Sequence, residues 1–377
     1  MSEIYPAATE QTLPFLRSGL QNIEMEARLG QAFALSDRAV AEDVTPGAVL
    51  AVGTQDQVVF HCSGNTTSLE NGAPVKINTL YDMASISKLF TTFMALKLLE
   101  QGAFRLDDPV SLFLPEYQRS DKATIRMRHL MTHTSGLLPH DNFFLTCSSQ
   151  QEMLNAIAAS PQQTAPGTQV AYSCLGYITL GNALQRISGQ TLSEFLNQEL
   201  FLPLGLQETG YNPQYSKNRI APTEVCSWQK GKLCWGEVHD ENARCQGGVS
   251  GNAGIFSSAR DMACFAQMWI GEGSYRNKRL LSPQTVRTSI LNYTAAIGEE
   301  HRGLGWLLKS PTYSFMGDLA SAASFGHTGF TGTSIVINPR NGIFVVWLTN
   351  RVHPNRTENR HIRCRSLIHN AVFAALS

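Results

Sequence analysis

The sequence lacks long apolar runs, an excess of charge of either sign and any cysteine cluster, and each absence excludes a class of protein. No stretch approaches the roughly eighteen apolar residues that a membrane-spanning helix needs. Lys plus Arg and Asp plus Glu each number 30, so electrostatics gives no reason to expect nucleic acid or an anionic membrane as a partner. The eight cysteines contain no C-x-x-C pair, which argues against a zinc site or a small disulfide scaffold.

Several catalytic signatures are also missing. There is no G-x-S-x-G nucleophile elbow, which excludes the α/β-hydrolase route, and no G-x-G-x-x-G or P-loop, so nucleotides are not implied. His129 and His133 have the i, i+4 spacing of a metal pair but lack the adjacent Glu of H-E-x-x-H, and we interpret them as structural. No metal or organic cofactor is therefore expected.

The N-terminal segment Met1–Leu20 has no basic region followed by an apolar one, so it does not resemble a secretory signal. We expect a cytoplasmic protein if this N-terminus is native, and a periplasmic or secreted one if a leader was removed. At 377 residues, the chain can form one large domain or two interleaved ones. Its 30 glycines and 16 prolines are typical of a folded enzyme rich in turns.

The pattern of apolar residues predicts strands near both ends of the chain and helices between them. Apolar, β-branched runs at 48–52, 57–61, 334–337 and 343–348 are typical of strands, and Asn341-Gly342 is a hairpin signal. Helices are expected at 24–42, from Ser85 to about 102, and at 126–131, 150–159, 175–188, 192–200, 261–271 and 358–376. Residues 109–252 are expected to contain only helices and loops.

These elements predict an α+β fold, in which an antiparallel sheet is flanked by helices and a mostly helical region is inserted. Residues 1–80 and 255–377 would form a discontinuous sheet domain, and residues 81–254 a helical domain. Ser85 would then lie in a cleft at the junction.

The segment Ser85-Ile86-Ser87-Lys88 places a hydroxyl and an amine three residues apart at the start of an apolar helix. Side chains at i and i+3 share a helix face, so the two groups can come within hydrogen-bonding distance. A serine hydroxyl becomes a good nucleophile only when a base removes its proton. Lys88 can be that base if its amine is neutral, and we expect burial to lower its pKa.

Two other segments carry candidate chemistry. Tyr172 lies on a turn before a helix, and because phenols and lysines titrate in a similar range, a Tyr–Lys pair can share a proton. It could equally be an aromatic that anchors a loop. The glycine-rich run 325–333 is expected on or beside a late strand, where backbone N–H groups can point at an oxyanion and His327 and Thr328 can contact a substrate.

Together these segments resemble the serine β-lactamase and penicillin-binding protein superfamily, in particular its class C-like branch with family VIII carboxylesterases and D-stereospecific peptidases. The resemblance extends over roughly residues 47 to 349 and depends on the order of several segments. They are Met83-Ala-Ser-Ile-Ser-Lys88; Ile125-Arg-Met-Arg-His-Leu-Met-Thr-His-Thr-Ser-Gly-Leu137; Pro166-Gly167 with Tyr172-Ser173; Gly247-Gly-Val-Ser-Gly-Asn-Ala-Gly-Ile-Phe256; and His327-Thr-Gly329.

The resemblance implies a β-lactamase/transpeptidase-like fold and an acyl-enzyme mechanism. Ser85 would be the nucleophile, and Lys88 and Tyr172 would form its proton-transfer network. The backbone N–H groups of Ser85 and Phe330 would form the oxyanion hole. Cys174, His327, Thr328 and Gly329 occupy the positions that would contact the substrate.

Two departures from the family pattern bear on the substrate. Cys174 stands where the family usually has an Asn whose amide would bond the amide side chain of a β-lactam or peptide, and a thiol cannot replace that contact. We interpret Cys174 as a small buried apolar side chain. His327 stands where many β-lactamases have a lysine, and a neutral histidine binds a carboxylate less well, although some peptidases of the family also have a histidine there.

We therefore expect a β-lactamase-related serine hydrolase that cleaves small acyl esters through an acyl-Ser85 intermediate. One alternative is a D-Ala-D-Ala-type peptidase or weak class C-like β-lactamase, and another is a non-hydrolysing penicillin-binding module. The expected partner is a small-molecule acyl substrate. Nothing in the sequence specifies an oligomeric state.

Overall fold

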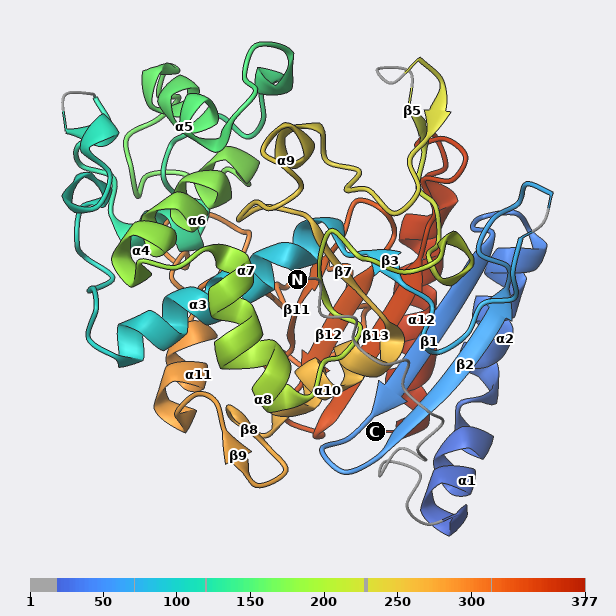
Figure 1. The fold of residues 1–377 in the computed structure, drawn as a ribbon. Coiled ribbons are helices and arrows are strands. Elements are labelled where there is room, and N and C mark those ends of the chain that lie inside the picture. The colour runs from blue at the N-terminus through green and yellow to red at the C-terminus, as the bar shows by residue number, and fades with distance from the viewer. Residues whose placement is uncertain (1–18, 71, 119–120, 227–229, 313, 377) are drawn as a thin grey trace.

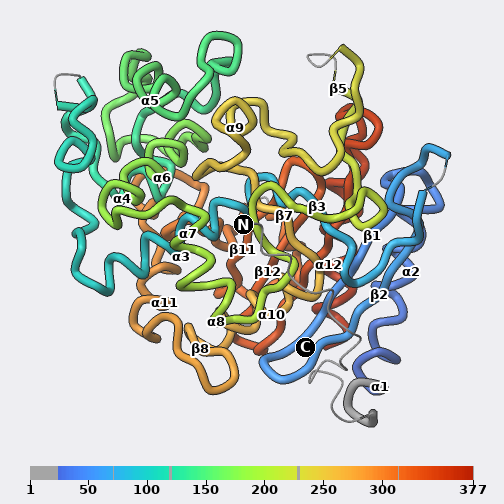
Figure 2. Tube along the Cα trace, viewed as in Figure 1, coloured from blue at the N-terminus to red at the C-terminus, as the bar shows by residue number. Residues whose placement is uncertain are grey.

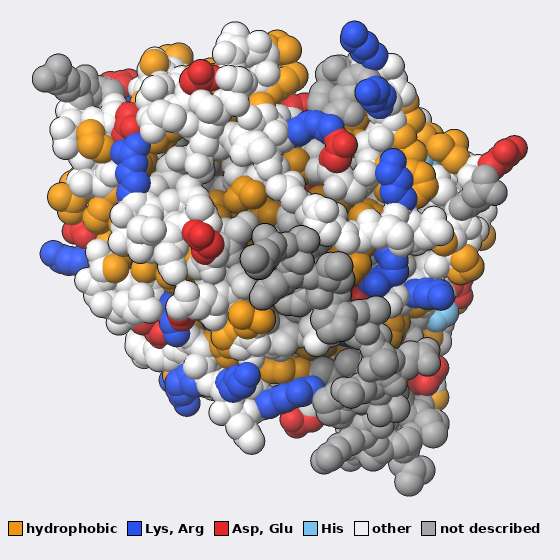
Figure 3. Space-filling view, viewed as in Figure 1, with side chains coloured by type: hydrophobic (Ala, Val, Ile, Leu, Met, Phe, Trp, Pro, Cys, Tyr) orange, Lys and Arg blue, Asp and Glu red, His pale blue; other side chains and the backbone are white. Residues whose placement is uncertain are grey.

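The computed structural model describes residues 19–70, 72–118, 121–226, 230–312 and 314–376. The prediction that residues 1–20 carry no leader falls almost entirely outside these residues. None of the described helices is both long enough and apolar enough to cross a membrane. On the face drawn in Figure 3, Lys and Arg side chains are interspersed with Asp and Glu, in line with the balanced composition.

The two ends of the chain form one antiparallel sheet of six strands, in the order β10-β11-β12-β13-β1-β2 (Figure 1). Two hairpins provide four of them, and β1 pairs with β13 from Ala48 opposite Thr349 to Gly53 opposite Phe344. Figure 2 shows the blue N-terminal strands beside the red C-terminal ones. The strand bounds are β1 Gly47–Gly53, β2 Val58–Gly64, β10 Leu307–Leu308, β11 Phe325–Thr328, β12 Ser334–Asn338 and β13 Ile343–Thr349.

Alternate residues of the central strands face opposite layers, because successive side chains of a strand point to opposite faces. On β1, Ala48, Leu50 and Val52 pack into the cluster under α2 (Gly30–Ala41) and α12 (Arg360–Leu376). Val49 and Ala51 belong to the larger cluster, which includes α10 (Ala259–Ile270). Burial on both faces explains why these strands are apolar throughout rather than alternating.

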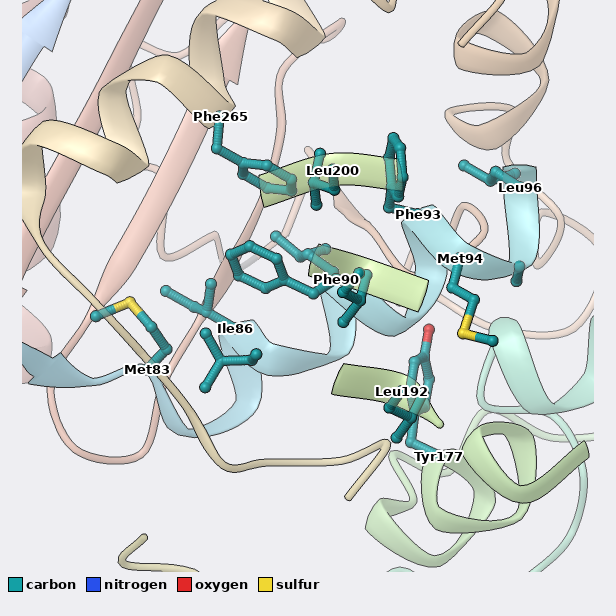
Figure 4. Packing of buried hydrophobic residues seen from close by; sticks show 14 of the residues in the cluster. Met83, Ile86, Phe90, Phe93, Met94, Leu96, Tyr177, Leu192, Leu200 and Phe265 are labelled. Atoms are coloured by element: carbon teal, nitrogen blue, oxygen red, sulfur yellow. The ribbon is translucent and has the colours of Figure 1, made fainter. Parts of the chain in front are cut away.

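The helix of the Ser85 segment is the centre of the larger core. This helix, α3 (Ser87–Glu100), is buried at every position from Ser87 to Leu96. Figure 4 shows Phe90 and Phe93 of α3 near Leu200 and Phe265, and Phe90 stacks on Phe265 with ring centroids 4.7 Å apart. A helix that is apolar all round is expected to be enclosed by other elements.

The remaining predicted helices form within a few residues of their expected bounds, with one exception. Residues 24–42 were expected to be one helix but form two, α1 (Gly19–Arg28) and α2, which are separated at Leu29 just before Gly30. Glycine disfavours the interior of a helix, and this explains the position of the break. The other helices are α4 Met127–Met131, α5 Gln150–Ala159, α6 Cys174–Ser188, α7 Leu192–Leu196, α8 Leu202–Leu204, α9 Glu241–Cys245 and α11 Pro283–Ser289, and a π-helical turn at Asn197–Phe201 joins α7 to α8.

The prediction that residues 109–252 contain no strand is wrong. Among the described residues of this range, β4 belongs to a small sheet of order β3-β7-β4, and β5 and β6 form a short hairpin. A second short hairpin, β8–β9, follows later in the chain. Most of these strands have only two residues, which is too short for a period-2 pattern to be visible in the sequence. Their bounds are β3 Tyr81–Asp82, β4 Gly210–Tyr211, β5 Val225–Cys226, β6 Lys232–Leu233, β7 Ile255–Ser257, β8 Ser274–Tyr275 and β9 Lys278–Arg279.

The small sheet brings together the segments on either side of the proposed domain boundaries. Tyr81 pairs with Ser257 and Asp82 with Phe256, so β3 and β7 lie side by side just before Ser85. All six strands of the large sheet come from residues 47–64 and 307–349. The division into 1–80 with 255–377 and 81–254 stays a prediction.

Candidate active site

Ser85 lies on a tight turn between β3 and α3. Met83 donates its N–H to the Ile255 carbonyl (2.9 Å), and the 3₁₀ turn Ala84–Ile86 follows. Ala84 has a φ of 47°, a left-handed conformation that is costly for a residue with a Cβ, and its N–H donates to Asp82 Oδ1 (2.8 Å). Between residues 79 and 96, all of them described, Ser85 alone is partly accessible.

Lys88 is fully buried beneath Ser85, and its three N–H donors all have partners. Its Nζ donates to Ser85 Oγ (3.1 Å), Cys174 Sγ (3.5 Å) and the Asn252 carbonyl (3.0 Å). Burial lowers the pKa of Lys88, but the sulfur of Cys174 and the oxygen of Tyr172, negative when ionised, outweigh it and raise the pKa above its ordinary value. The expectation that burial would lower the pKa of Lys88 is therefore wrong, because burial comes together with acidic neighbours.

Tyr172 precedes α6 and lies against Lys88, whose Nζ is 5.0 Å from the centre of its ring. The phenol oxygen is buried, and the side chains of Lys88 and Ser85 interact with it. Burial raises the pKa of Tyr172, and the positive charge of Lys88 opposes this only in part. The pKa of each member of the pair therefore lies above its ordinary value.

His133 contacts the segment that carries Tyr172. Its ring lies 4.4 Å from that of Tyr172, and its Nδ1 accepts the Ser173 N–H (3.1 Å). Burial and the charges of Arg302 and Lys88 lower its pKa well below the ordinary value, so the ring is neutral. No group of three or more metal-ligating side chains occurs among the described residues. This geometry supports the structural interpretation of His133.

Cys174 is not the small buried apolar side chain that the sequence indicated. It is partly accessible, begins α6, and contacts Lys88 Nζ through its sulfur. Its position is fixed by Ser173, which caps α6 by accepting the Gly176 N–H (2.9 Å). The interpretation failed because the sequence does not show that position 174 faces Lys88.

The glycine-rich loop 247–254 supplies a contact that the sequence did not identify. The Asn252 carbonyl accepts from Lys88, and the Gly251 carbonyl accepts from Thr91 Oγ1 (2.8 Å). A Cβ on Gly251 would overlap the Tyr177 carbonyl, so the backbone approaches α6 closely. Every residue has a backbone carbonyl, so the sequence could not show that the carbonyl of Asn252 would accept a hydrogen bond from Lys88. The glycines were the only feature of the sequence that singled out this loop.

The strand β11 brings His327 beside Tyr172, with ring centroids 6.0 Å apart. His327 Nδ1 donates to the Thr328 carbonyl (2.8 Å), and its buried Nε2 has no partner. Burial, together with the charges of Arg302 and Lys88, lowers the pKa of His327 to about 3. The ring is therefore neutral at pH 7, as the sequence predicted.

The turn after β11 is tied to the Ser85 turn by two hydroxyls. Thr331 Oγ1 donates to the Asp82 carbonyl (2.7 Å) and Thr333 Oγ1 to the Met83 carbonyl (3.2 Å). A Cβ on Gly329 would lie 2.5 Å from the Met83 oxygen, so glycine is required at that contact. Within the described chain, the Phe330 N–H donates to no protein atom.

Arg302 is a second cation that sequence reasoning missed. Its guanidinium carbon lies 5.4 Å from the Tyr172 ring centroid, and the residue is 5% exposed. Its Nε donates to Glu300 Oε1 (2.6 Å), while no acceptor for its Nη atoms occurs in the described part of the chain. Arg302 belongs to none of the sequence motifs, so nothing in the sequence indicated that it would lie beside Tyr172.

A charged cluster lies behind Phe330 and includes His239, Glu224 and Arg356. The His239 ring stacks on Phe330 (5.7 Å), its Nε2 bonds Glu224 Oε2 (2.9 Å), and its N–H donates to Asp82 Oδ2 (2.7 Å). Arg356 also bonds Glu224, through Nε (2.7 Å). Burial raises the pKa of Glu224, but His239 and Arg356 outweigh it and bring the pKa to about 2. His239 has a raised pKa, because Glu224 overcomes its burial.

The structure thus places the residues predicted from sequence around one point. Lys88 contacts Ser85 and Cys174 directly, and Tyr172 lies between Lys88 and His327. The turn that carries Phe330 is bonded to the turn that carries Ser85. This arrangement offers an accessible hydroxyl, a buried proton carrier and an unpaired backbone N–H, which are the elements of nucleophilic acyl transfer.

Comparison with known proteins gives a consistent result. A family model described as Beta-lactamase matches residues 34–368. A candidate D-alanyl-D-alanine carboxypeptidase of Escherichia coli strain K12 is 31% identical over 93% of this chain and 87% of that protein. An N-acetylmuramyl-L-alanine amidase of Bacillus subtilis strain 168 is 32% identical over 84% of this chain and 80% of that protein.

Solved structures resemble the fold over nearly the whole chain. EstCE1, described as a hydrolase with promiscuous acyltransferase activity, has a TM-score of 0.75 at 21% identity, covering 94% of this chain and 100% of its own. A beta-lactamase/D-alanine carboxypeptidase from Pseudomonas syringae has a TM-score of 0.73 at 20% identity, covering 91% and 98%. The β-lactamase/transpeptidase-like fold predicted from the sequence is confirmed.

We predict that Glu224→Gln destabilises the protein by about 2 kcal/mol near pH 5.5, the usual magnitude for a hydrogen-bonded charge. The pKa of Glu224 is lowered from 4.5 to about 2, so its contribution is present above the unfolded value and is lost as the pH falls toward 2. The pKa of His239 is raised in the folded protein. Its contribution to the free energy of unfolding is therefore fully present below the pKa of the unfolded state and is lost as the pH rises through the pKa of the folded state.

Urea unfolding at several pH values measures this effect, with Glu272→Gln as the control. Glu272 pairs with Arg287 at 2.7 Å on the surface, and such pairs contribute about 1 kcal/mol or less. The difference in unfolding free energy between wild type and Glu224→Gln should be greatest near pH 5.5 and shrink on either side. A difference that does not depend on pH would contradict the assignment.

Proposed function

This chain belongs to the beta-lactamase family and is a serine hydrolase, and from that premise we propose that it hydrolyses small acyl esters through an acyl-Ser85 intermediate. One observation carries the proposal. Lys88 Nζ donates to the oxygen of Ser85 at 3.1 Å, and Ser85 alone is accessible in an otherwise buried segment. A hydroxyl held by a buried proton carrier and open to solvent on its other side is poised for nucleophilic attack.

In the acylation step, Ser85 Oγ would attack the ester carbonyl and lose its proton to the Tyr172–Lys88 pair. The negative charge that develops on the carbonyl oxygen would be met by the backbone N–H groups of Ser85 and Phe330. The pair would then return the proton to the leaving alcohol, which leaves the acyl group on Ser85.

Deacylation would repeat these roles with water as the nucleophile. Water would lose a proton to the Tyr172–Lys88 pair, attack the acyl carbonyl and release the carboxylic acid, and Ser85 would recover its proton. Because Lys88 and Tyr172 lie against each other and both have raised pKa values, they titrate as one unit. The base in both steps is the form of this pair that has lost one proton.

Two features favour esters over amides. Cys174 contacts Lys88 through sulfur, where an amide side chain would donate and accept hydrogen bonds to a peptide-like substrate. His327 is neutral and buried, so this side of the site offers no charge to a substrate carboxylate through that residue. His327, Thr328 and Gly329 would contact the substrate from the C-terminal end of β11.

A D-Ala-D-Ala-type peptidase or weak class C-like β-lactamase is the second candidate, and Arg302 is the observation that favours it. Its Nη atoms lie near Tyr172 with no protein acceptor within the described residues, and guanidinium groups bind carboxylates well. The E. coli relative named above is a candidate D-alanyl-D-alanine carboxypeptidase. A non-hydrolysing penicillin-binding module is disfavoured, since Ser85, Lys88 and Tyr172 are all present and in contact range.

Ser85→Ala should reduce turnover of p-nitrophenyl butyrate by at least about 10³-fold, because it removes the nucleophile. Intact-protein mass spectrometry of the wild type should show a transient butyryl adduct, mapped to Ser85 by digestion. The matched control is Ser87→Ala, which removes a buried hydroxyl on the same helix that accepts the Ile255 N–H. Full activity of the Ser85→Ala variant would contradict the proposal. A stable penicilloyl adduct, formed when the wild type is incubated with penicillin and never hydrolysed, would indicate a binding module instead.

The kcat/KM for the same ester should rise with pH, about tenfold per unit, with no plateau below roughly pH 8. The reason is that the pKa values of Lys88 and Tyr172 are both raised, so the pair must lose a proton before it can accept one. Tyr172→Phe should lower kcat/KM and remove this rise, with Ser85→Ala giving the background. A wild-type profile that is flat from pH 6 upward would contradict this assignment.

Arg302→Met should separate the two candidate functions. If the substrate carries a carboxylate, the variant should raise KM for an acyl-D-Ala-D-lactate depsipeptide about tenfold or more and leave KM for neutral p-nitrophenyl butyrate unchanged. Steady-state kinetics with both substrates measures this. If the variant changes KM for both substrates equally and only slightly, and the wild type hydrolyses the depsipeptide slowly, the ester function would be the sole candidate.

A further inference from the structure

Arg351 is a buried cation whose hydrogen bonds go to neutral carbonyl groups. It follows β13 and is 9% exposed. Its Nε donates to the Phe330 carbonyl (3.0 Å) and its Nη1 to the Glu358 carbonyl (2.8 Å). Within the described residues, no carboxylate forms an ion pair with it. Burying an unpaired cation costs folding free energy, so the position needs an explanation beyond stability.

The guanidinium also fixes the side chain of Phe330. Its carbon lies 4.8 Å from the Phe330 ring centroid, and Phe330 as a whole is 46% exposed. Arg351 therefore holds this residue twice, by its carbonyl and by its ring. Cation–π contacts of this kind contribute about 0.5–1 kcal/mol at accessible sites.

The same turn is anchored on its opposite side to the Ser85 segment. Thr331 and Thr333 bond the carbonyls of Asp82 and Met83. On the β13 side, Thr349 Oγ1 donates to the Gly332 carbonyl (2.9 Å), and a Cβ on Gly332 would lie 3.0 Å from Arg351 Cγ. The threonines set the distance of the turn from Ser85, and Arg351 sets the orientation of Phe330 within it.

We propose that Arg351 is a positioning residue, which holds the backbone of Phe330 through its carbonyl so that the Phe330 N–H points at the oxyanion formed on the Ser85-bound carbonyl. The inference rests on the proposed function, in which Phe330 donates to that oxyanion. A charge-assisted bond to the Phe330 carbonyl restricts the rotation of the backbone on one side of the donor. The fixed positive charge beside the turn also favours the negative charge of the transition state.

The test compares Arg351→Met with Arg356→Met. Arg356 lies over the same ring at 5.6 Å but bonds Glu224 and Glu241 rather than the Phe330 backbone, so it controls for charge near the ring. Active sites are titrated with a fluorophosphonate, and kcat and KM are measured per active site with p-nitrophenyl butyrate. Removing one oxyanion donor costs about 10²–10³ in kcat, so misorienting one should cost about tenfold or more.

We expect Arg351→Met to lower kcat about tenfold or more, with KM within about twofold, because the oxyanion contact forms only in the transition state. Affinity for phenylboronic acid, which forms a tetrahedral adduct with a serine, should fall by a similar factor. Arg356→Met should leave kcat within about twofold. A merely structural role would lower the number of titratable sites and leave kcat per site unchanged, which would overturn the inference.

Two further outcomes would also overturn it. An equal loss of kcat in the Arg356 variant would assign the effect to charge rather than to the backbone bond. If Arg351→Met does not fold, Arg351→Lys is measured, and wild-type kcat in that variant would count against the inference because one ammonium cannot reproduce both carbonyl bonds. The proposed function fails separately, if wild-type hydrolysis persists in Ser85→Ala.

Discussion

The buried ammonium of Lys88 is the interaction on which the rest of the site depends. Its three donors reach Ser85 on its own helix, Cys174 at the start of α6 and the Asn252 carbonyl in the glycine-rich loop. A fully buried ammonium is tolerated only when its donors are satisfied, so the three segments must come together for the chain to fold. The condition that stabilises Lys88 therefore also assembles the site, and α3 supplies the apolar surroundings.

Positive charge is distributed around this centre so that it faces the reacting oxygen atoms from several sides. Lys88 and Arg302 lie on the Tyr172 ring, and Arg351 lies behind Phe330. The histidines between them are neutral, because burial and the nearby cations lower their pKa values. A site of this kind favours negative charge that appears during the reaction, as an oxyanion does. This electrostatic character agrees with an acyl-transfer enzyme of the beta-lactamase family.

Predictions from the sequence succeeded where a local pattern has a physical cause. The apolar strands at 48–52 and 343–348, the hairpin at Asn341-Gly342 and the helix at 150–159 all form close to their predicted bounds. The two-residue strands were missed, because pairing with distant segments stabilises them rather than a pattern of their own. The spacing of apolar residues predicted one continuous helix over residues 24–42, but the helix is interrupted at Leu29.

By itself, the sequence determined the fold class, the position of Ser85 and Lys88 on one helix face, and the neutral character of His327, since spacing and ordinary pKa values are enough for these. Only the tertiary structure decided the direction of the Lys88 pKa shift, the contact between Cys174 and Lys88, and the positions of Arg302 and Arg351. A pKa or a long-range hydrogen bond depends on groups far apart in the chain, and their distances are set only when the core closes around them.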